Sequence, residues 1–167
     1  MRPGLPFANI THLGWAVRDI DKTIKTFEDL GLGPWRHNIL GETGTGREFA
    51  ERDDGGGMEQ RAKVALARWG AMIIELFEPI NFPVVEKFLE EHGEGIWHFG
   101  YSVNQEQFDA TIAEVKKQGI DVIGTSLRKN GVRMAFLDPE KTGGVMFQLH
   151  DCPPEMEEFL DTMGMMV

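Results

Sequence analysis

Several features that would mark a protein class are scarce in this sequence. One cysteine in 167 residues excludes an intrachain disulfide framework and fits a reducing compartment. Basic residues are few: 17 Lys and Arg against 27 Asp and Glu give a net charge of −10, which excludes a duplex nucleic-acid partner. No apolar run approaches the length of a membrane span, and the first residues lack the apolar core of a secretory signal. We therefore expect a cytoplasmic protein with no nucleic-acid or membrane partner.

What the sequence does contain is an internal repeat. The segment His12-Leu-Gly-Trp-Ala-Val17 recurs as His98-Phe-Gly-Tyr-Ser-Val103. Both copies predict a strand, and each is followed by a helical pattern, over residues 19–30 and 105–118, that ends at a glycine. Apolar strands then close each unit, at 63–69 and 71–78 in the first and at 132–137 and 144–151 in the second.

The repeat predicts an α+β protein. Two β-α-β-β-β modules, over residues 8–80 and 94–151, would combine their strands into one cup-shaped mixed sheet and so form a single domain over 8–151. Residues 82–92 predict a connecting helix, and residues 152–167 a C-terminal tail helix. The glycine-rich, charged residues 41–60 fall outside the repeat and predict a loop over a site, an extended hairpin tip or a disordered insertion.

Four polar side chains at equivalent positions of the two modules predict a metal site. His12 and His98 begin equivalent strands, while Glu75 and Gln148 each interrupt an apolar strand. A buried carboxylate is costly unless it is paired with a cation. Two imidazoles, one carboxylate and one amide suit a borderline divalent ion with positions left for a chelating substrate. The sequence therefore predicts one bound ion of cobalt, nickel, zinc, manganese or iron.

At these residues the chain resembles the vicinal oxygen chelate superfamily, which has the glyoxalase/bleomycin-resistance/dioxygenase-like fold. The resemblance extends over residues 8–151 and is strongest to the methylmalonyl-CoA epimerase-like branch. The segments that carry it are 31–35 (GLGPW), 74–79 (IELFEP), 88–98 (FLEEHGEGIWH) and 142–145 (TGGV). It implies a metal held by His12, Glu75, His98 and residue 148, a small-molecule substrate such as an acyl-CoA, and a homodimer.

One departure from the family pattern bears on the mechanism. The family usually has glutamate at position 148, which binds metal and moves the substrate proton, whereas the amide of Gln148 cannot accept a proton at neutral pH. We therefore assign the base to Glu75, in the other module, and predict an isomerase, epimerase or lyase that enolises a carbonyl substrate. No carboxylate is present over residues 61–67 to act as a second base. The first candidate for that role is His150, on the same strand face as Gln148, and the weaker candidates are Lys63, Glu48 and Glu51.

Three other functions stay open at the level of sequence. Two histidines and one carboxylate are also the ligand set of non-haem iron oxygenases, so a ring-cleaving dioxygenase is one alternative. Glyoxalase I activity is another, although it would expect a carboxylate at position 148. The third is a non-catalytic protein that binds a small molecule, as drug-resistance members of this fold do, with Trp15, Trp97 and Tyr101 as core or lining residues.

Overall fold

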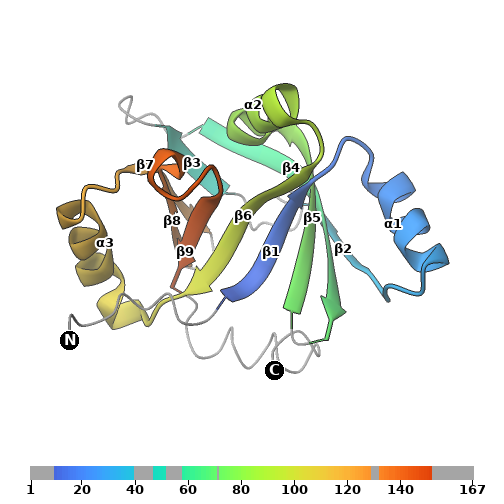
Figure 1. Ribbon diagram of the computed structural model, residues 1–167, viewed down its shortest axis with the longest axis horizontal. Coiled ribbons are helices and arrows are strands. Elements are labelled where there is room, and N and C mark those ends of the chain that lie inside the picture. The colour runs from blue at the N-terminus through green and yellow to red at the C-terminus, as the bar shows by residue number, and fades with distance from the viewer. Residues whose placement is uncertain (1–9, 40–46, 52–57, 71, 129–131, 152–167) are drawn as a thin grey trace.

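The computed structural model describes residues 10–39, 47–51, 58–70, 72–128 and 132–151, which form one mixed sheet with helices packed against it (Figure 1). The first half contains β1 (Ile10–Ala16), α1 (Ile20–Asp29), β2 (Arg36–Ile39), β3 (Arg47–Glu51), β4 (Met58–Trp69) and β5 (Met72–Asn81). After α2 (Pro83–His92), the second half contains β6 (Gly95–Ser102), the 3₁₀ turn η1 (Gln105–Gln107), α3 (Phe108–Lys117), β7 (Val122–Arg128), β8 (Arg133–Leu137), the turn η2 (Pro139–Lys141) and β9 (Met146–His150).

The two halves repeat the same strand pairing, which confirms the predicted α+β fold with a mixed sheet. In each half the first strand pairs in parallel with the last, β1 with β5 and β6 with β9. The two first strands, β1 and β6, pair antiparallel at the centre of the molecule. The histidine-containing copies of the repeat therefore lie next to each other, and the fold places residues 86 positions apart in contact.

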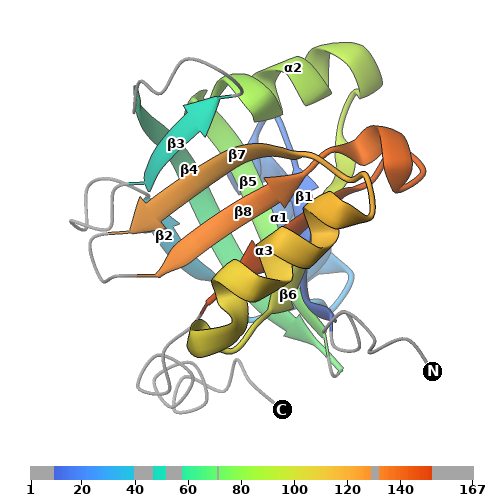
Figure 2. The ribbon, with the colours of Figure 1, turned by 90° about the vertical axis from the view of Figure 1, so that its left-hand side faces the viewer.

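The glycine-rich segment supplies a strand that the modular pattern did not predict. Of the three interpretations of residues 41–60, the described part matches the extended hairpin, because β3 pairs antiparallel with the start of β4. β3 also pairs with β7 of the other half, and β4 pairs with β5, so the strands close into a ring (Figure 2). The first module thus has one strand more than the predicted β-α-β-β-β. Residues 40–46 and 52–57 lie outside the described residues.

Each module covers the outside of its strands with its own helix. Ile20 and Ile24 of α1 pack against the outer side of the first half, and Phe108 and Val115 of α3 pack against that of the second. Figure 1 shows α1 and α3 on opposite sides of the sheet and α2 at one end. α1 begins where the carboxylate of Asp19 accepts a hydrogen bond from the backbone N–H of Lys22.

The space enclosed by the strands is filled with apolar side chains near α2. Phe77, Phe82, Trp97 and Phe136 are almost wholly buried there and contact one another through their rings. Val85 and Leu89 of α2 belong to the same cluster, so this helix closes one end of the ring.

The chain termini lie outside the described residues, whereas the expectation about membrane-spanning helices can be compared with them. The C-terminal helix predicted over residues 152–167 lies outside them, as do the first nine residues. Within the described part of the chain, no helix is both long enough and apolar enough to cross a bilayer.

Candidate metal centre

The centre of the candidate site is built from the two copies of the repeat. His12 lies on β1 and His98 on β6, and each imidazole lies over the glycine of the opposite copy. A Cβ added to Gly14 would overlap the ring of His98, and a Cβ added to Gly100 would overlap the ring of His12. The motif His-X-Gly in both strands was the signal for this arrangement, and sequence reasoning used only its histidines.

The strands next to this pair bring in the two remaining predicted residues. Gly14 is paired in register with Glu75 on β5, and Gly100 is paired with Gln148 on β9. The carboxylate of one module and the amide of the other therefore occupy equivalent places around the two rings. The sequence repeat predicted this equivalence, and the strand register shows it.

Three of the four predicted side chains converge on one point. Nε2 of His12 lies 3.0 Å from Nε2 of His98. Oε2 of Glu75 lies 3.8 Å from Nε2 of His12 and 3.5 Å from Nε2 of His98. All three side chains contribute a ligand atom to a group whose members lie within 4.8 Å of one another.

This donor set fits a divalent ion. Two atoms bound to one ion at about 2.0–2.2 Å each cannot be more than about 4.4 Å apart, and the three measured separations satisfy that limit. Burial supports the same conclusion, because His98 is wholly buried and Glu75 is 6% exposed. A carboxylate at this depth needs compensating positive charge or hydrogen bonds, and a bound divalent ion would provide that charge.

Gln148, the fourth predicted ligand, is placed at the centre by its backbone pairing with Gly100, over which the ring of His12 lies. It is 2% exposed, and its Nε2 has no hydrogen-bond partner among the described residues. A buried amide that lacks a hydrogen-bond partner costs free energy. Because Gln148 lies beside the two imidazole rings, its amide is suited to contact an ion or substrate bound at this centre.

Over residues 61–67, β4 has no acidic or basic side chain on its inner face. Over residues 61–67 of β4, the inward-facing side chains are those of Ala62, Val64 and Leu66, which belong to the apolar interior. Lys63, the weaker candidate on this strand, instead pairs with Glu78 at 2.8 Å, which raises the pKa of its ammonium group. Glu78 in turn accepts the backbone N–H of Ile20, so this ion pair supports the start of α1.

His150, the other candidate for a second base, lies close to the centre but is already engaged. It is 9% exposed, and its ring centroid lies 5.6 Å from that of His12. Its Nε2 lies 3.0 Å from Oγ1 of Thr11, a residue that sequence reasoning did not select. Thr11 also contacts Nδ1 of His12 at 3.1 Å, so it links the two histidines.

The two remaining histidines of the chain, His37 and His92, lie away from the centre. His37 on β2 is exposed, and His92 ends α2 with 63% of its side chain exposed. Trp97 packs in the interior beside His98, whereas Trp15 and Tyr101 belong to the clusters under α1 and α3.

Comparison with known proteins identifies a family and one relative. A model of the Glyoxalase/Bleomycin resistance protein/Dioxygenase superfamily matches residues 11–136. The uncharacterised protein YqjC of Bacillus subtilis (strain 168) is 30% identical over 154 residues, which are 89% of this chain and 94% of that protein.

Two solved structures extend the comparison to the fold. The hypothetical protein BH1468 from Bacillus halodurans C-125 is 27% identical, with a TM-score of 0.61, over 87% of this chain and 94% of the other. The methylmalonyl-CoA epimerase from Mycobacterium tuberculosis is 24% identical, with a TM-score of 0.65, over 93% of this chain and 95% of the other.

Proposed function

We propose, from the premise that this chain belongs to the glyoxalase/bleomycin resistance protein/dioxygenase superfamily, that it is a divalent-metal-dependent isomerase, epimerase or lyase. Its reaction would begin with removal of the proton next to a carbonyl. The observation that carries the proposal is the convergence of His12, Glu75 and His98 within 4.8 Å at the centre of the sheet. The likeness in fold to a methylmalonyl-CoA epimerase supports an acyl-CoA thioester as the first substrate class to test.

The four candidate side chains would have two roles, binding of the ion and transfer of the substrate proton. His12, Glu75 and His98 would hold the ion, and the amide oxygen of Gln148 would add a fourth ligand. The bound divalent cation would supply electrostatic stabilisation of the negative charge that develops on the carbonyl oxygen. Glu75 is the carboxylate of the cluster, so we assign it the proton removal, whereas Gln148 can orient a substrate but cannot accept its proton.

The distribution of bases favours chemistry on one face of the carbon. Inversion needs a proton acceptor on one face and a donor on the other, and the inward face of β4 over residues 61–67 is apolar. Glu75 alone is sufficient for an isomerisation or elimination in which one group removes and returns the proton. Among the side chains that the structure describes, His150 on β9 is the candidate for the second group that epimerisation would need.

Metal content is the first test. Elemental analysis and metal titration of the wild type should find one divalent ion per chain. His98→Ala should lose that ion, because it removes a wholly buried ligand, while Gln148→Glu should retain it. A wild-type protein that cannot be loaded would contradict the metalloenzyme proposal and leave a small-molecule binding protein.

Proton exchange tests the chemistry separately. The loaded protein should catalyse exchange of the α-proton of methylmalonyl-CoA or of a hydroxy ketone in deuterated water, and Glu75→Gln should abolish it. Exchange without inversion indicates one base, whereas inversion that is lost in His150→Gln indicates two. A loaded wild-type protein that exchanges neither probe above the buffer rate would contradict enolisation.

A second candidate function has one observation in its favour. The described cluster is a set of two histidines and one carboxylate, the ligand set of non-haem iron oxygenases. Iron as the bound ion, with uptake of oxygen when a catechol is added, would support a ring-cleaving dioxygenase. Proton exchange with cobalt, nickel, zinc or manganese would support the isomerase or lyase.

A further inference from the structure

We propose that Thr11 and His150 form a positioning pair that orients His12, so that Nε2 of this ring faces the ion and Nδ1 carries the proton. This inference rests on the proposed metal centre. Neither residue was selected for this role by sequence reasoning, and neither belongs to the group of converging ligand atoms. In this role the pair would act on the metal through His12.

The position of Thr11 follows from an irregularity in β1. Ile10 is paired with Tyr101 and His12 with Gly100, so Thr11 is an extra residue in β1 where β6 has none. Adjacent residues on a regular strand point to opposite faces, whereas such a bulge re-aims one of them. The bulge allows the Thr11 hydroxyl to lie 3.1 Å from Nδ1 of its neighbour His12.

The hydrogen bonds of Thr11 determine where the ring protons lie. Its hydroxyl donates to the carbonyl oxygen of Gly100 at 3.0 Å, and a carbonyl can only accept. The single hydroxyl proton is thereby used. We therefore assign the contacts from Thr11 Oγ1 to His12 Nδ1 and to His150 Nε2 to donation by the two rings, each through an N–H group.

This assignment prepares His12 for a metal. A neutral imidazole protonated at Nδ1 has its lone pair on Nε2, the atom that faces His98 and Glu75. With this tautomer, we assign the 3.0 Å contact between the two Nε2 atoms to donation by Nε2 of His98 when the site holds no metal. His12 would therefore keep its tautomer when an ion binds, whereas His98 would have to change.

The equivalent place in the other module is apolar. A second bulge makes Trp97 the extra residue before His98, and the strand position equivalent to that of His150 is occupied by Phe77. These two rings contact each other at 5.5 Å between centroids, and Trp97 meets His98 edge-on at 4.3 Å. The pseudo-symmetric site thus places hydroxyl and imidazole groups beside His12 and two aromatic rings at the equivalent places beside His98.

Thr11→Val, which keeps the shape and removes the hydroxyl, tests the pair. It should weaken metal binding about 10- to 100-fold, the usual effect of losing a group that orients a histidine ligand. Thr11→Ser should restore wild-type affinity. Thr26→Val is the matched control, because Thr26 makes its side-chain bond to Lys22 on the exposed surface of α1. Thermal unfolding should show that all variants are folded.

His150→Phe tests whether His150 acts through Thr11. This variant introduces the residue found at the equivalent strand position and should weaken metal binding less than Thr11→Val does. The double variant should bind no worse than Thr11→Val alone, because both changes remove one chain of contacts. Losses that add in the double variant would show that His150 acts on the metal independently and would overturn the pairing.

The tautomers give a readout that needs neither activity nor metal. Nitrogen-15 spectra of the metal-free wild type should show His12 protonated at Nδ1, with its signals assigned from a His12→Gln variant. Thr11→Val should shift this ring toward the Nε2-protonated form. An unchanged His12 tautomer in Thr11→Val would overturn the inference. A wild type that shows these tautomers but binds no metal would refute the proposed function and leave the hydrogen-bond assignment intact.

Discussion

At the scale of single residues, two glycines decide whether the histidines can converge. Gly14 and Gly100 each lie where the ring from the opposite strand needs space, and each comes two residues after the histidine of its own strand. Each His-X-Gly copy therefore supplies one candidate ligand, its histidine, and the space for the histidine of the other copy, at its glycine. A side chain at either glycine would separate the metal-binding nitrogens without removing them.

Gly14→Ala and Gly100→Ala should therefore abolish metal binding although all four proposed ligands remain. Each added methyl would overlap an imidazole, which should cost roughly 1–3 kcal/mol of stability and displace the ring. Metal titration and chemical denaturation measure the two effects. Gly95→Ala on β6 is the matched control, because its added Cβ would meet no atom within 4 Å. Metal affinity unchanged in Gly14→Ala would contradict the reciprocal arrangement.

Tyr101 offers a second test at the residue scale, because it is the one tyrosine of the chain. Burial raises the pKa of its hydroxyl above the ordinary value of 10.0, so the folded protein holds this proton more tightly than the unfolded chain. The unfolded state then binds fewer protons between the two pKa values, and stability should fall as pH rises through that interval.

Ultraviolet absorbance of tyrosinate measures this titration directly. The midpoint in the native protein should lie above that in denaturant, and Tyr101→Phe should remove the signal. Equal midpoints in the two states would contradict the burial of Tyr101 under α3.

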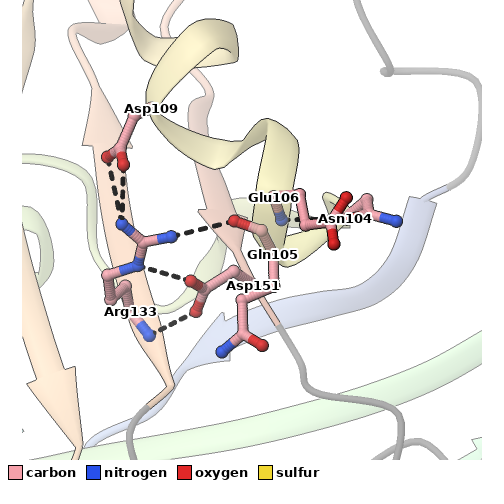
Figure 3. A network of polar contacts seen from close by, with 6 residues as sticks. All are labelled: Asn104, Gln105, Glu106, Asp109, Arg133 and Asp151. Atoms are coloured by element: carbon pink, nitrogen blue, oxygen red, sulfur yellow. Dashed lines mark hydrogen bonds and ion pairs between the residues drawn. The ribbon is translucent and has the colours of Figure 1, made fainter.

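At the scale of elements, one ion-pair network connects two strands and a helix of the second module. Arg133 at the start of β8 donates to the carboxylate of Asp151 at 2.5 Å and to that of Asp109 on α3 at 3.0 Å (Figure 3). Its guanidinium also donates to the carbonyl of Gln105 and lies over the ring of Phe108 at 4.7 Å. Arg133 thereby joins β8, the end of β9 and the start of α3.

Arg133→Ala should destabilise the protein by about 2 kcal/mol. Asp151 is wholly buried and would lose its cation, but the partly exposed Arg133 side chain keeps the loss below that of a fully buried pair. Arg133→Lys should recover only part of the loss, because lysine lacks the planar fork that reaches two carboxylates. Chemical denaturation measures these differences, and wild-type stability in Arg133→Ala would contradict the role of the network.

At the scale of the whole molecule, the candidate centre joins the two modules. Its ligands come from β1 and β5 in the first half and from β6 in the second, so an ion would bind residues of both. A ligand that binds only the folded state stabilises it by mass action. Metal occupancy and global stability should therefore change together.

Adding metal at about 100 times its Kd should stabilise the protein by about 2.7 kcal/mol, which corresponds to a rise in Tm of roughly 5–10 °C. A chelator should reverse the shift, and His98→Ala should show none. Scanning calorimetry of the wild type with and without chelator provides the measurement. An equal rise in His98→Ala would show that the metal binds elsewhere.

The sequence by itself determined the fold class and the residues of the candidate site. The repeat around His12 and His98 implied equivalent strands, and polar residues in apolar strands singled out Glu75 and Gln148. Both conclusions depend on local pattern and on pseudo-symmetry, which are written into the order of residues.

Only the tertiary structure decided the features that depend on contacts between distant segments. Pattern along one strand cannot show that β3 pairs with β7, that each glycine lies under the opposite imidazole, or that Thr11 reaches His150 across the sheet. A bulge of one residue placed Thr11 beside His12, and that irregularity becomes visible only when β1 is aligned with β6. Strand register is set by the packing of the whole sheet, and it determines where the candidate ligands lie relative to one another.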